Sequence, residues 1–336
     1  MNMKVHFINV GYGEAILLEY SDPAAPDNNR TILIDGGSAE PEEYAGNPFR
    51  IPAAEYLKKR GVTRLDVVIN THIHEDHTGS LAEITGTFPV GEFWSCLRID
   101  AGEKELPGEL AFSNSSQKFI SALNASRRIS GNLNNRKIPA RNLCLGERVP
   151  NIIPGLEIEV LGPPPQDISD FSKLLPELYA AKTVEESRDL ITRLDRDMNN
   201  HSIILALQFQ GKRILLVGDT NRDGYGRLLD GDSRRALRAD VFKLGHHGQM
   251  DSVSPEILSA VDPAIAVVCA SSDRRYNSSN PDLLSIVRKY GDNRSRPVDI
   301  LFSDVPELPP FSDGVPGHYA AVIEIKDGTL RWYYET

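Results

Sequence analysis

Cysteine is scarce in this sequence, and its spacing excludes two common structural devices. The three cysteines, Cys96, Cys144 and Cys269, lie far apart, and no C-x-x-C pair occurs. An odd number of cysteines without paired spacing indicates neither a disulfide framework nor a cysteine-ligated zinc knuckle. Each cysteine is therefore expected to be a small buried apolar residue.

Long apolar runs are missing as well. No stretch approaches the roughly 18–20 apolar residues that a membrane-spanning helix needs. The first residues, Met1–His6, lack the apolar segment of a secretory signal. The sequence thus predicts a cytoplasmic protein that does not contact a membrane.

Positive charge is outnumbered, with 37 Lys and Arg against 47 Asp and Glu and a net charge of −10. A surface of that sign repels a phosphate backbone at long range, although a local basic patch remains possible. Long nucleic acid is therefore disfavoured as a partner, and a small-molecule or phosphoester substrate is expected. The composition does not determine the oligomeric state.

Apolar runs bounded by turn residues predict two groups of strands. The first group is Val5–Val10, Ala15–Tyr20 and Thr31–Ile34, an expected antiparallel meander. A helix at Ile51–Arg60 and a buried strand at Leu65–Asn70 follow. The later part of the chain repeats this plan of strands and then helices. Its expected strands are Leu156–Leu161, Ser202–Phe209, Arg213–Val217, Val241–Leu244, Ala264–Cys269, Tyr319–Ile325 and Thr329–Tyr334.

Two stretches lack this pattern. Residues 100–150 are polar and rich in Asn and Ser, which indicates an insertion of helix and loop. Residues 163–200 are expected to be irregular around a proline cluster, with an amphipathic helix near Val184–Leu194. Neither stretch resembles a separate domain. The prediction is one domain over residues 1–336, with insertions at about 100–150 and 163–200.

Histidine is the residue whose placement points to chemistry. The chain has eight histidines, and His72, His74 and His77 fall within six residues, with Asp76 among them. A strand end places residues i and i+2 on the same side, so His72 and His74 can share one metal ion. Asp76 and His77 then point to a second position. The alternative is a solvated polar loop, or histidines whose hydrogen bonds are satisfied in the core. Imidazole and carboxylate ligands suit Zn²⁺ best, and Mn²⁺ or Fe also fit.

One loop cannot complete two metal sites, so other strand ends must contribute. Asp219 directly follows the apolar run Ile214–Val217, and a carboxylate can bridge two cations. The alternative for Asp219 is an ordinary β-turn. His246 and His247 follow the expected strand Val241–Leu244, and His246 is preferred over His247 as the last ligand.

These motifs together resemble the metallo-β-lactamase superfamily. The resemblance implies an α/β fold, a four-layer αββα sandwich with two divalent metal ions at the edge between its sheets. It is closest to the branch that contains the soluble C-terminal domain of ComEC-type competence proteins and the bacterial phosphorylcholine esterases. The residues that support this branch are His6–Ala15, Asp35-Gly36-Gly37, Asn199-Asn200-His201-Ser202 and Lys243–Gly248.

The sequence also departs from that branch. Asn9, Tyr12 and Glu14 replace its Asp, Gln and Asp, and Arg275–Pro281 stands where the branch has N-x-Y-G-H-P, without its histidine. The resemblance therefore implies a substrate that differs from those of the branch.

Four further residues are expected in catalytic or supporting roles, namely Asp35, Asn199, His201 and His247. His201 stands where the branch usually has Asn. It is therefore a candidate metal ligand, a candidate substrate contact, or a strand residue that faces solvent.

The expected reaction is hydrolysis by a metal-bound hydroxide formed near neutral pH. The branch resemblance favours phosphodiester or phosphomonoester substrates. Acyl hydrolysis of a lactone, thioester or lactam is the alternative enzyme reading. A non-catalytic metal-binding module is the alternative from another class, and the redox and sulfur chemistry known in the superfamily also stays open.

Overall fold

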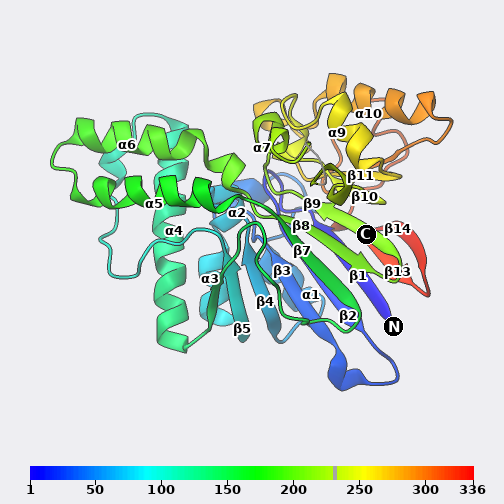
Figure 1. Cartoon of the computed structure of the whole chain (residues 1–336), viewed down its shortest axis with the longest axis horizontal. Coiled ribbons are helices and arrows are strands. Elements are labelled where there is room, and N and C mark those ends of the chain that lie inside the picture. Colours follow the sequence, from blue (N-terminus) through cyan, green and yellow to red (C-terminus); the bar gives the residue numbers. More distant parts are fainter. Residues whose placement is uncertain (230–232) are drawn as a thin grey trace.

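Two β-sheets pack face to face in the computed structural model, which describes residues 1–229 and 233–336, and helices cover both outer faces (Figure 1). The predicted four-layer αββα sandwich is confirmed. Its layers follow from side-chain alternation along the strands. In β8, for example, Leu205 and Leu207 face the other sheet, whereas Ile204 and Ala206 face the outer helices.

The first sheet has eight strands in the order β14-β13-β1-β2-β3-β4-β5-β6. Strands β1, β2 and β3 pair antiparallel, as the meander prediction required, but they lie inside the sheet and not at its edge, because β13 and β14 add beyond β1. The strands from β3 to β6 run parallel. The bounds are β1 Asn2–Ile8, β2 Ile16–Ser21, β3 Arg30–Ile34, β4 Leu65–Asn70, β5 Val90–Ser95, β6 Ala140–Asn142, β13 Ala320–Lys326 and β14 Thr329–Glu335.

The second sheet has six strands in the order β12-β11-β10-β9-β8-β7. Here β7, β8 and β9 are antiparallel and β9 to β12 are parallel, so the loops after β9, β10 and β11 leave the same sheet edge. The bounds are β7 Leu156–Gly162, β8 Ile204–Phe209, β9 Lys212–Leu216, β10 Val241–Lys243, β11 Ile265–Val268 and β12 Asp299–Phe302. Strands β5, β6 and β12 were not predicted.

Helices cover the outer face of each sheet. The first sheet carries α1 and α3, and the second carries α9 and α10, each with its own buried apolar cluster. The bounds are α1 Ala53–Lys59, α2 Glu75–Thr78, α3 Leu81–Thr87, α7 Arg222–Gly226, α8 Ser233–Ala236, α9 Pro255–Val261 and α10 Pro281–Asn293. Cys96 and Cys269 are buried as expected, whereas Cys144 is only half-buried.

The two predicted insertions supply three long helices that pack together at one end of the sandwich (Figure 1). They are α4 Asn114–Arg136, α5 Pro165–Ala180 and α6 Val184–Arg196. The amphipathic helix near residues 184–194 is confirmed as α6. The expectation of irregular chain from residue 163 is wrong over α5. A proline in the first turn suits a helix start, so the proline cluster marked where α5 begins.

The single-domain organisation stays a prediction. Within the part of the chain that the structure describes, no helix is both long enough and apolar enough to cross a membrane.

Candidate metal centre

The loops after β4, β9 and β10 bring most of the predicted site residues together. His72 and His74 follow β4, and Asp76 and His77 lie in the short helix α2 behind them. Asp219 follows β9. The residues that directly follow a strand have well-defined positions because the preceding backbone is hydrogen-bonded in the sheet.

One group of side chains has its ligand atoms within 4.8 Å of one another, and it consists of Asp76, His77, Asp219 and His247. The Nε2 atom of His247 lies 3.0 Å from Asp76 Oδ2 and 2.9 Å from Asp219 Oδ2. The Nε2 atom of His77 lies 3.3 Å from Asp219 Oδ1. One carboxylate oxygen of Asp219 therefore lies beside the Nε2 atom of each imidazole.

Hydrogen bonds on the far side of the two rings decide which nitrogens face this group. His77 Nδ1 lies 2.7 Å from Asp35 Oδ2, and His247 Nδ1 lies 2.8 Å from the backbone oxygen of Cys269. Both partners are acceptors, so each Nδ1 carries the hydrogen. In the neutral rings each Nε2 then turns a lone pair toward the carboxylates of Asp76 and Asp219.

His72 and His74 form a second convergent pair by the same logic. Thr71 Oγ1 donates to Asp35 Oδ2 at 2.6 Å, so it accepts from His72 Nδ1 at 3.1 Å. His74 Nε2 donates to Asp195 Oδ1 at 3.0 Å. The remaining nitrogens, His72 Nε2 and His74 Nδ1, lie 3.1 Å apart. Two imidazole lone pairs face each other, as expected of ligands that share a cation.

The pKa shifts in this group also indicate a site that favours positive charge. Burial lowers the pKa of His72 well below its ordinary value, and His77 and His74 add to this effect. Burial opposes charge on His247, but Asp219 and Asp76 outweigh it and raise the pKa of His247 to about 9. Burial likewise raises the pKa of Asp219, yet His247 and His77 hold it well below the ordinary value.

The donor set therefore fits divalent metal ions. Among the residues that the structure describes, His77 Nε2, His247 Nε2 and Asp219 Oδ1 are buried without a hydrogen-bond partner. Nitrogen and carboxylate ligands that converge in this way are the chemistry of a zinc-type site.

The preference for His246 over His247 needs correction, because the structure brings His247 into the group. His246 instead has Nδ1 2.9 Å from Asp251 Oδ1 and Nε2 3.1 Å from the amide nitrogens of Asn199 and Gln249. The two histidines have φ angles of +42° and +53°. Two successive left-handed residues turn the chain, so the first residue of the pair does not face the centre.

The other predicted residues lie around this group in different roles. Asp35 is fully buried and accepts hydrogen bonds from His77 and Thr71, so it supports ligands rather than joining them. Asn199 contacts His246 and lines the cavity above the centre. His201 belongs to neither convergent set, and its ring packs 5.8 Å from that of Phe171 on α5.

Sequence reasoning missed two supporting features. A buried ion pair joins Lys243 to Glu14, and Lys243 Nζ also donates to the backbone oxygen of Gly218 at 2.8 Å. Both residues were quoted in motifs, but nothing in the sequence paired them. Asp195 was hidden as one charge on the polar face of an amphipathic helix.

A cavity of about 400 Å³ opens above the centre. The inserted helices line one side with Lys118, Phe119, Asp195 and Arg196. Tyr12, which packs 4.5 Å from the ring of His247, and its neighbour Tyr276 also line the cavity. The two insertions therefore form part of the cavity wall.

Comparisons with known proteins agree with this geometry. Residues 9–170 match the model of the metallo-beta-lactamase superfamily. The chain is 23% identical to ComE operon protein 3 of Bacillus subtilis over 85% of its length, and 23% identical to Recombination protein 2 of Haemophilus influenzae over 82%. It spans only 31% and 24% of those two proteins.

Among solved structures, a metallo hydrolase named Igni18 from Ignicoccus hospitalis is similar over 97% of this chain and 99% of its own. The TM-score of that pair is 0.49 and the sequence identity is 14%.

Proposed function

Because this chain belongs to the metallo-β-lactamase superfamily, we propose that it hydrolyses phosphoesters with two divalent metal ions. Family membership makes the chain a metal-dependent hydrolase. The observation that carries the two-ion proposal is the set of four imidazoles, His72, His74, His77 and His247, each fixed by an outer acceptor with its free nitrogen turned inward. Zinc is the proposed metal, since the donors are nitrogen and carboxylate.

The proposed ligand sets follow from the two convergences. His72 and His74 would hold one ion, and Asp76, His77 and His247 the other. Asp219 would bridge, because its oxygens contact the second set and its charge also acts on His72. Ions bound there would supply a hydroxide nucleophile near neutral pH and neutralise charge on the substrate oxygens.

The residues around the cavity would orient substrate and move a proton. Asp251 fixes the His246 ring through Nδ1, and this ring lines the cavity beside Asn199. We assign His246 as the group that donates a proton to the leaving oxygen once its Nε2, which here accepts from the amides of Asn199 and Gln249, has taken up a proton. This role replaces its predicted role as a ligand. Lys118 and Arg196, on the inserted helices, bring positive charge to the wall and favour an anionic substrate.

The similarity to ComE operon protein 3 and Recombination protein 2 supports a phosphoester over an acyl substrate, by way of the branch to which the motifs point. The cavity and the net charge support a small substrate over long nucleic acid. The free cysteines support a reducing, cytoplasmic location.

Metal analysis and a paired substrate assay test this function. Protein purified without chelator should contain close to two equivalents of metal, and chelation should abolish turnover that Zn²⁺ or Mn²⁺ restores. Bis-(p-nitrophenyl) phosphate or p-nitrophenyl phosphate should be hydrolysed, with nitrocefin as the comparison. Failure to bind metal overturns the two-ion centre, and turnover of nitrocefin alone overturns the phosphoester assignment.

A further inference from the structure

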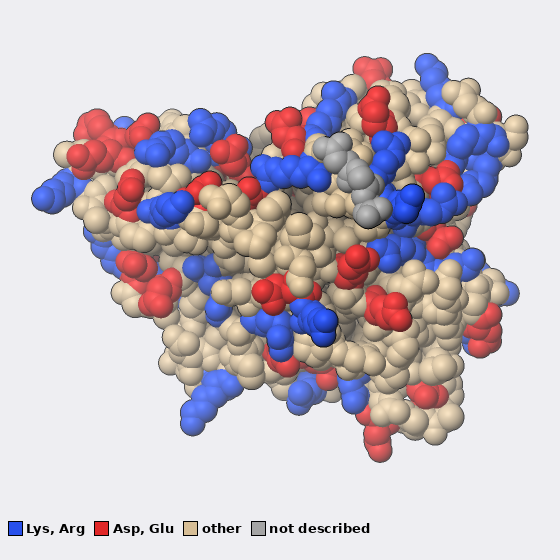
Figure 2. Space-filling view, in the orientation of Figure 1, with Lys and Arg blue, Asp and Glu red and all other residues tan. Residues whose placement is uncertain are grey.

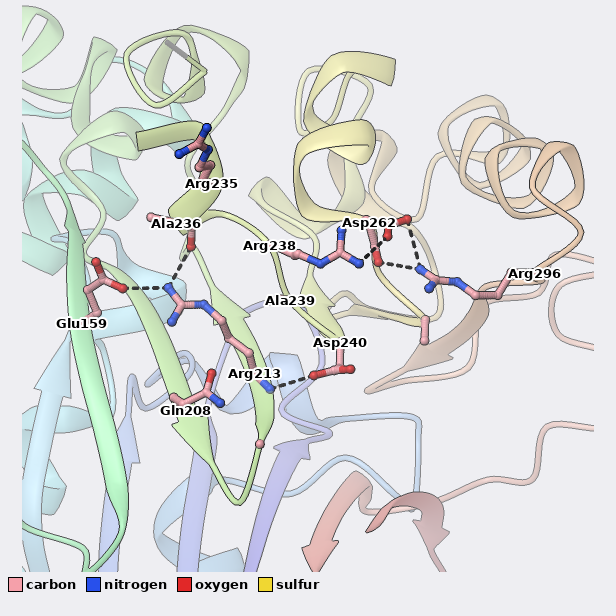
Figure 3. A pocket seen from close by; sticks show the side chains of 12 residues that line it. Glu159, Gln208, Arg213, Arg235, Ala236, Arg238, Ala239, Asp240, Asp262 and Arg296 are labelled. Atoms are coloured by element: carbon pink, nitrogen blue, oxygen red, sulfur yellow. Dashed lines mark hydrogen bonds and ion pairs between the residues drawn. The ribbon is translucent and has the colours of Figure 1, made fainter. Parts of the chain in front are cut away.

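A second hollow lies at the other end of the strands that lead to the metal centre (Figure 3). Its volume is about 600 Å³, and Arg213, Asp240 and Ala264 at the starts of β9, β10 and β11 form its floor. Arg213 lies near the start of β9, and Asp219, six residues later, lies in a turn beyond the end of that strand at Leu216. At about 3.3 Å per extended residue, the hollow lies within about 20 Å of the metal centre.

The lining of this hollow is basic although the chain is acidic. Four arginines face three carboxylates around it, in a protein whose net charge is −10. Figure 2 shows Lys and Arg side chains gathered on this part of the surface, near α9 and α10. We call the hollow the arginine groove; its charged lining residues are Arg213, Arg235, Arg238, Arg296, Glu159, Asp240 and Asp262.

Arg213 pairs with Glu159 at 2.7 Å and Arg235 also has a partner, so the surplus of positive charge lies around Asp262. Asp240 Oδ2 accepts the backbone N–H of Arg213 at 2.8 Å, so this oxygen holds the start of β9. Asp262 is shared by three guanidinium groups, those of Arg238 and Arg296 at 3.0 Å each and that of Arg294. One carboxylate cannot balance three cations.

Like-charge crowding acts on Arg294, the most buried of the three arginines around Asp262. Burial lowers the pKa of Arg294, and the neighbouring charges of Arg296 and Arg238 lower it further. The cluster is therefore short of negative charge, and a bound anion would relieve this repulsion.

Two of the guanidinium groups are available to a ligand. The Arg238 side chain is 70% exposed and that of Arg296 is 48% exposed. Figure 3 shows them reaching Asp262 from two sides. A guanidinium has five N–H donors, so each arginine keeps donors for an additional acceptor. The oxygens of a phosphate group match such donors in geometry and charge.

We propose that the arginine groove is a second anion site, which binds the phosphate group of a small ligand at a distance from the metal centre. Arg238 and Arg296 would contact the phosphate oxygens, and Asp262 would hold the two side chains in place. The position at the opposite ends of the strands keeps this ligand out of the reaction. The proposal does not depend on the substrate of the metal centre.

Calorimetric titration of the metal-loaded full chain with inorganic phosphate, and separately with pyrophosphate, tests the proposal. We expect two binding events in the unmodified protein. The double variant Arg238→Gln/Arg296→Gln should raise the Kd of one event at least tenfold and leave turnover within about twofold. Arg294 still pairs with Asp262 in this variant, so the carboxylate is not left without a partner.

Two controls make the result decisive. The variant Arg128→Gln/Arg141→Gln removes two exposed arginines outside the groove and should change neither event. Asp219→Asn should weaken only the event at the metal centre. If Asp219→Asn removes all phosphate binding, or the groove variant changes none, the second site does not exist.

A short single-stranded oligonucleotide distinguishes the sources of the phosphate group. Weaker binding of the oligonucleotide than of pyrophosphate supports a small ligand. Binding of the oligonucleotide alone, lost in the groove variant, overturns the small-ligand assignment. If the double variant fails to fold, the single variant Arg238→Gln gives the same comparison at the more exposed position.

Discussion

His246 and His247 are adjacent but occupy different chemical environments. His247 faces two carboxylates and is fully buried, whereas His246 faces the cavity and is held by Asp251. A ligand and a proton donor should respond differently to removal. This pair therefore separates metal binding from catalysis within one dipeptide.

We predict that His247→Ala loses metal and that His246→Gln does not. His246→Gln should instead lower turnover by about 10²–10⁴, the range for a general acid. The loss should be larger for an alkyl leaving group than for p-nitrophenol, which needs no proton. Metal analysis together with rates for both leaving groups measures this. Equal metal loss in both variants would restore His246 as a ligand.

Glu14 and Lys243 are another pair whose roles depend on each other. Both side chains are fully buried, and burial alone would favour their neutral forms. The charge of Glu14 outweighs burial and raises the pKa of Lys243, whereas burial outweighs Lys243 and raises the pKa of Glu14. The direct contact between Lys243 Nζ and Glu14 Oε2 is that of an ion pair. Lys243 also holds the backbone of Gly218, next to Asp219.

We predict that Lys243→Met lowers the free energy of unfolding by about 3–5 kcal/mol, because it leaves the Glu14 carboxylate buried without a counter-charge. The double variant Lys243→Met/Glu14→Gln should recover at least half of that loss. Denaturant unfolding of the metal-free protein gives both values. A double variant as unstable as the single one would show that packing, not charge, sets the cost.

At the scale of elements, helix α6 reaches the metal centre through one residue. Asp195 accepts from His74 Nε2, and Ser115 on α4 holds its other oxygen at 3.2 Å. An acceptor on the far ring nitrogen fixes the tautomer of a metal-binding histidine and its orientation. The two insertions thus contribute to the site as well as to the cavity wall.

We predict that Asp195→Ala weakens one of two bound ions by about 10–100-fold and leaves the other unchanged. Asp189→Ala is the matched control, since Asp189 lies on the same helix but is 71% exposed and points to Arg193. Titration with a competing chelator should resolve the ions as two steps. If both steps are unchanged in Asp195→Ala, His74 does not depend on α6.

Elements with a local signature could be predicted from the sequence. Strands β1 to β4 and β7 to β9 show apolar runs between turn residues, and His72, His74, Asp76 and His77 follow one of these strands. The fold class followed from the order of these strands and the helices between them, together with the histidine motif. The features that the sequence did not predict depend on contacts between distant segments or on backbone angles. The left-handed turn at His246 and His247 has no residue signature, because such angles usually mark glycine.

The role of Asp195 was not predicted from the sequence for a different reason. On an amphipathic helix, a charge on the polar face is normally solvated, and only the packing of α6 against α4 turns it toward His74. Helix α5 was missed because its polar and apolar residues surround Pro176, which usually argues against a helix.

At the scale of the whole molecule, charge is segregated along the strands of the second sheet. The carboxylates of the metal centre lie at the carboxyl ends, and the arginine groove lies at the opposite ends. A net charge of −10 therefore describes no single surface. The carboxylates at one end would attract metal cations, and the arginines at the other end would attract an anion.

A cluster of ion pairs and hydrogen bonds links strands β1 and β14, near the two ends of the chain, to helix α1. Glu335 accepts from Tyr56 Oη at 2.8 Å and pairs with Arg60 at 3.3 Å, and His6 lies 3.5 Å away. The hydrogen bond from His6 is the largest cause that lowers the pKa of Glu335 to about 2, and Tyr56 and Arg60 add to it against partial burial.

We predict that this cluster makes the fold sensitive to acid. A carboxyl whose folded pKa lies below its unfolded value of 4.5 stabilises the fold above that pH, and the gain is lost as pH falls toward 2. Glu335→Gln should therefore lower the free energy of unfolding at pH 7 by about 1 kcal/mol, after allowance for solvent screening. Near pH 2 the variant and the parent should be equally stable. Unfolding measured from pH 7 to pH 2, with the exposed Glu157→Gln as control, gives this profile. If the difference in free energy of unfolding between variant and parent stays constant with pH, then packing, and not the charge of Glu335, stabilises this cluster.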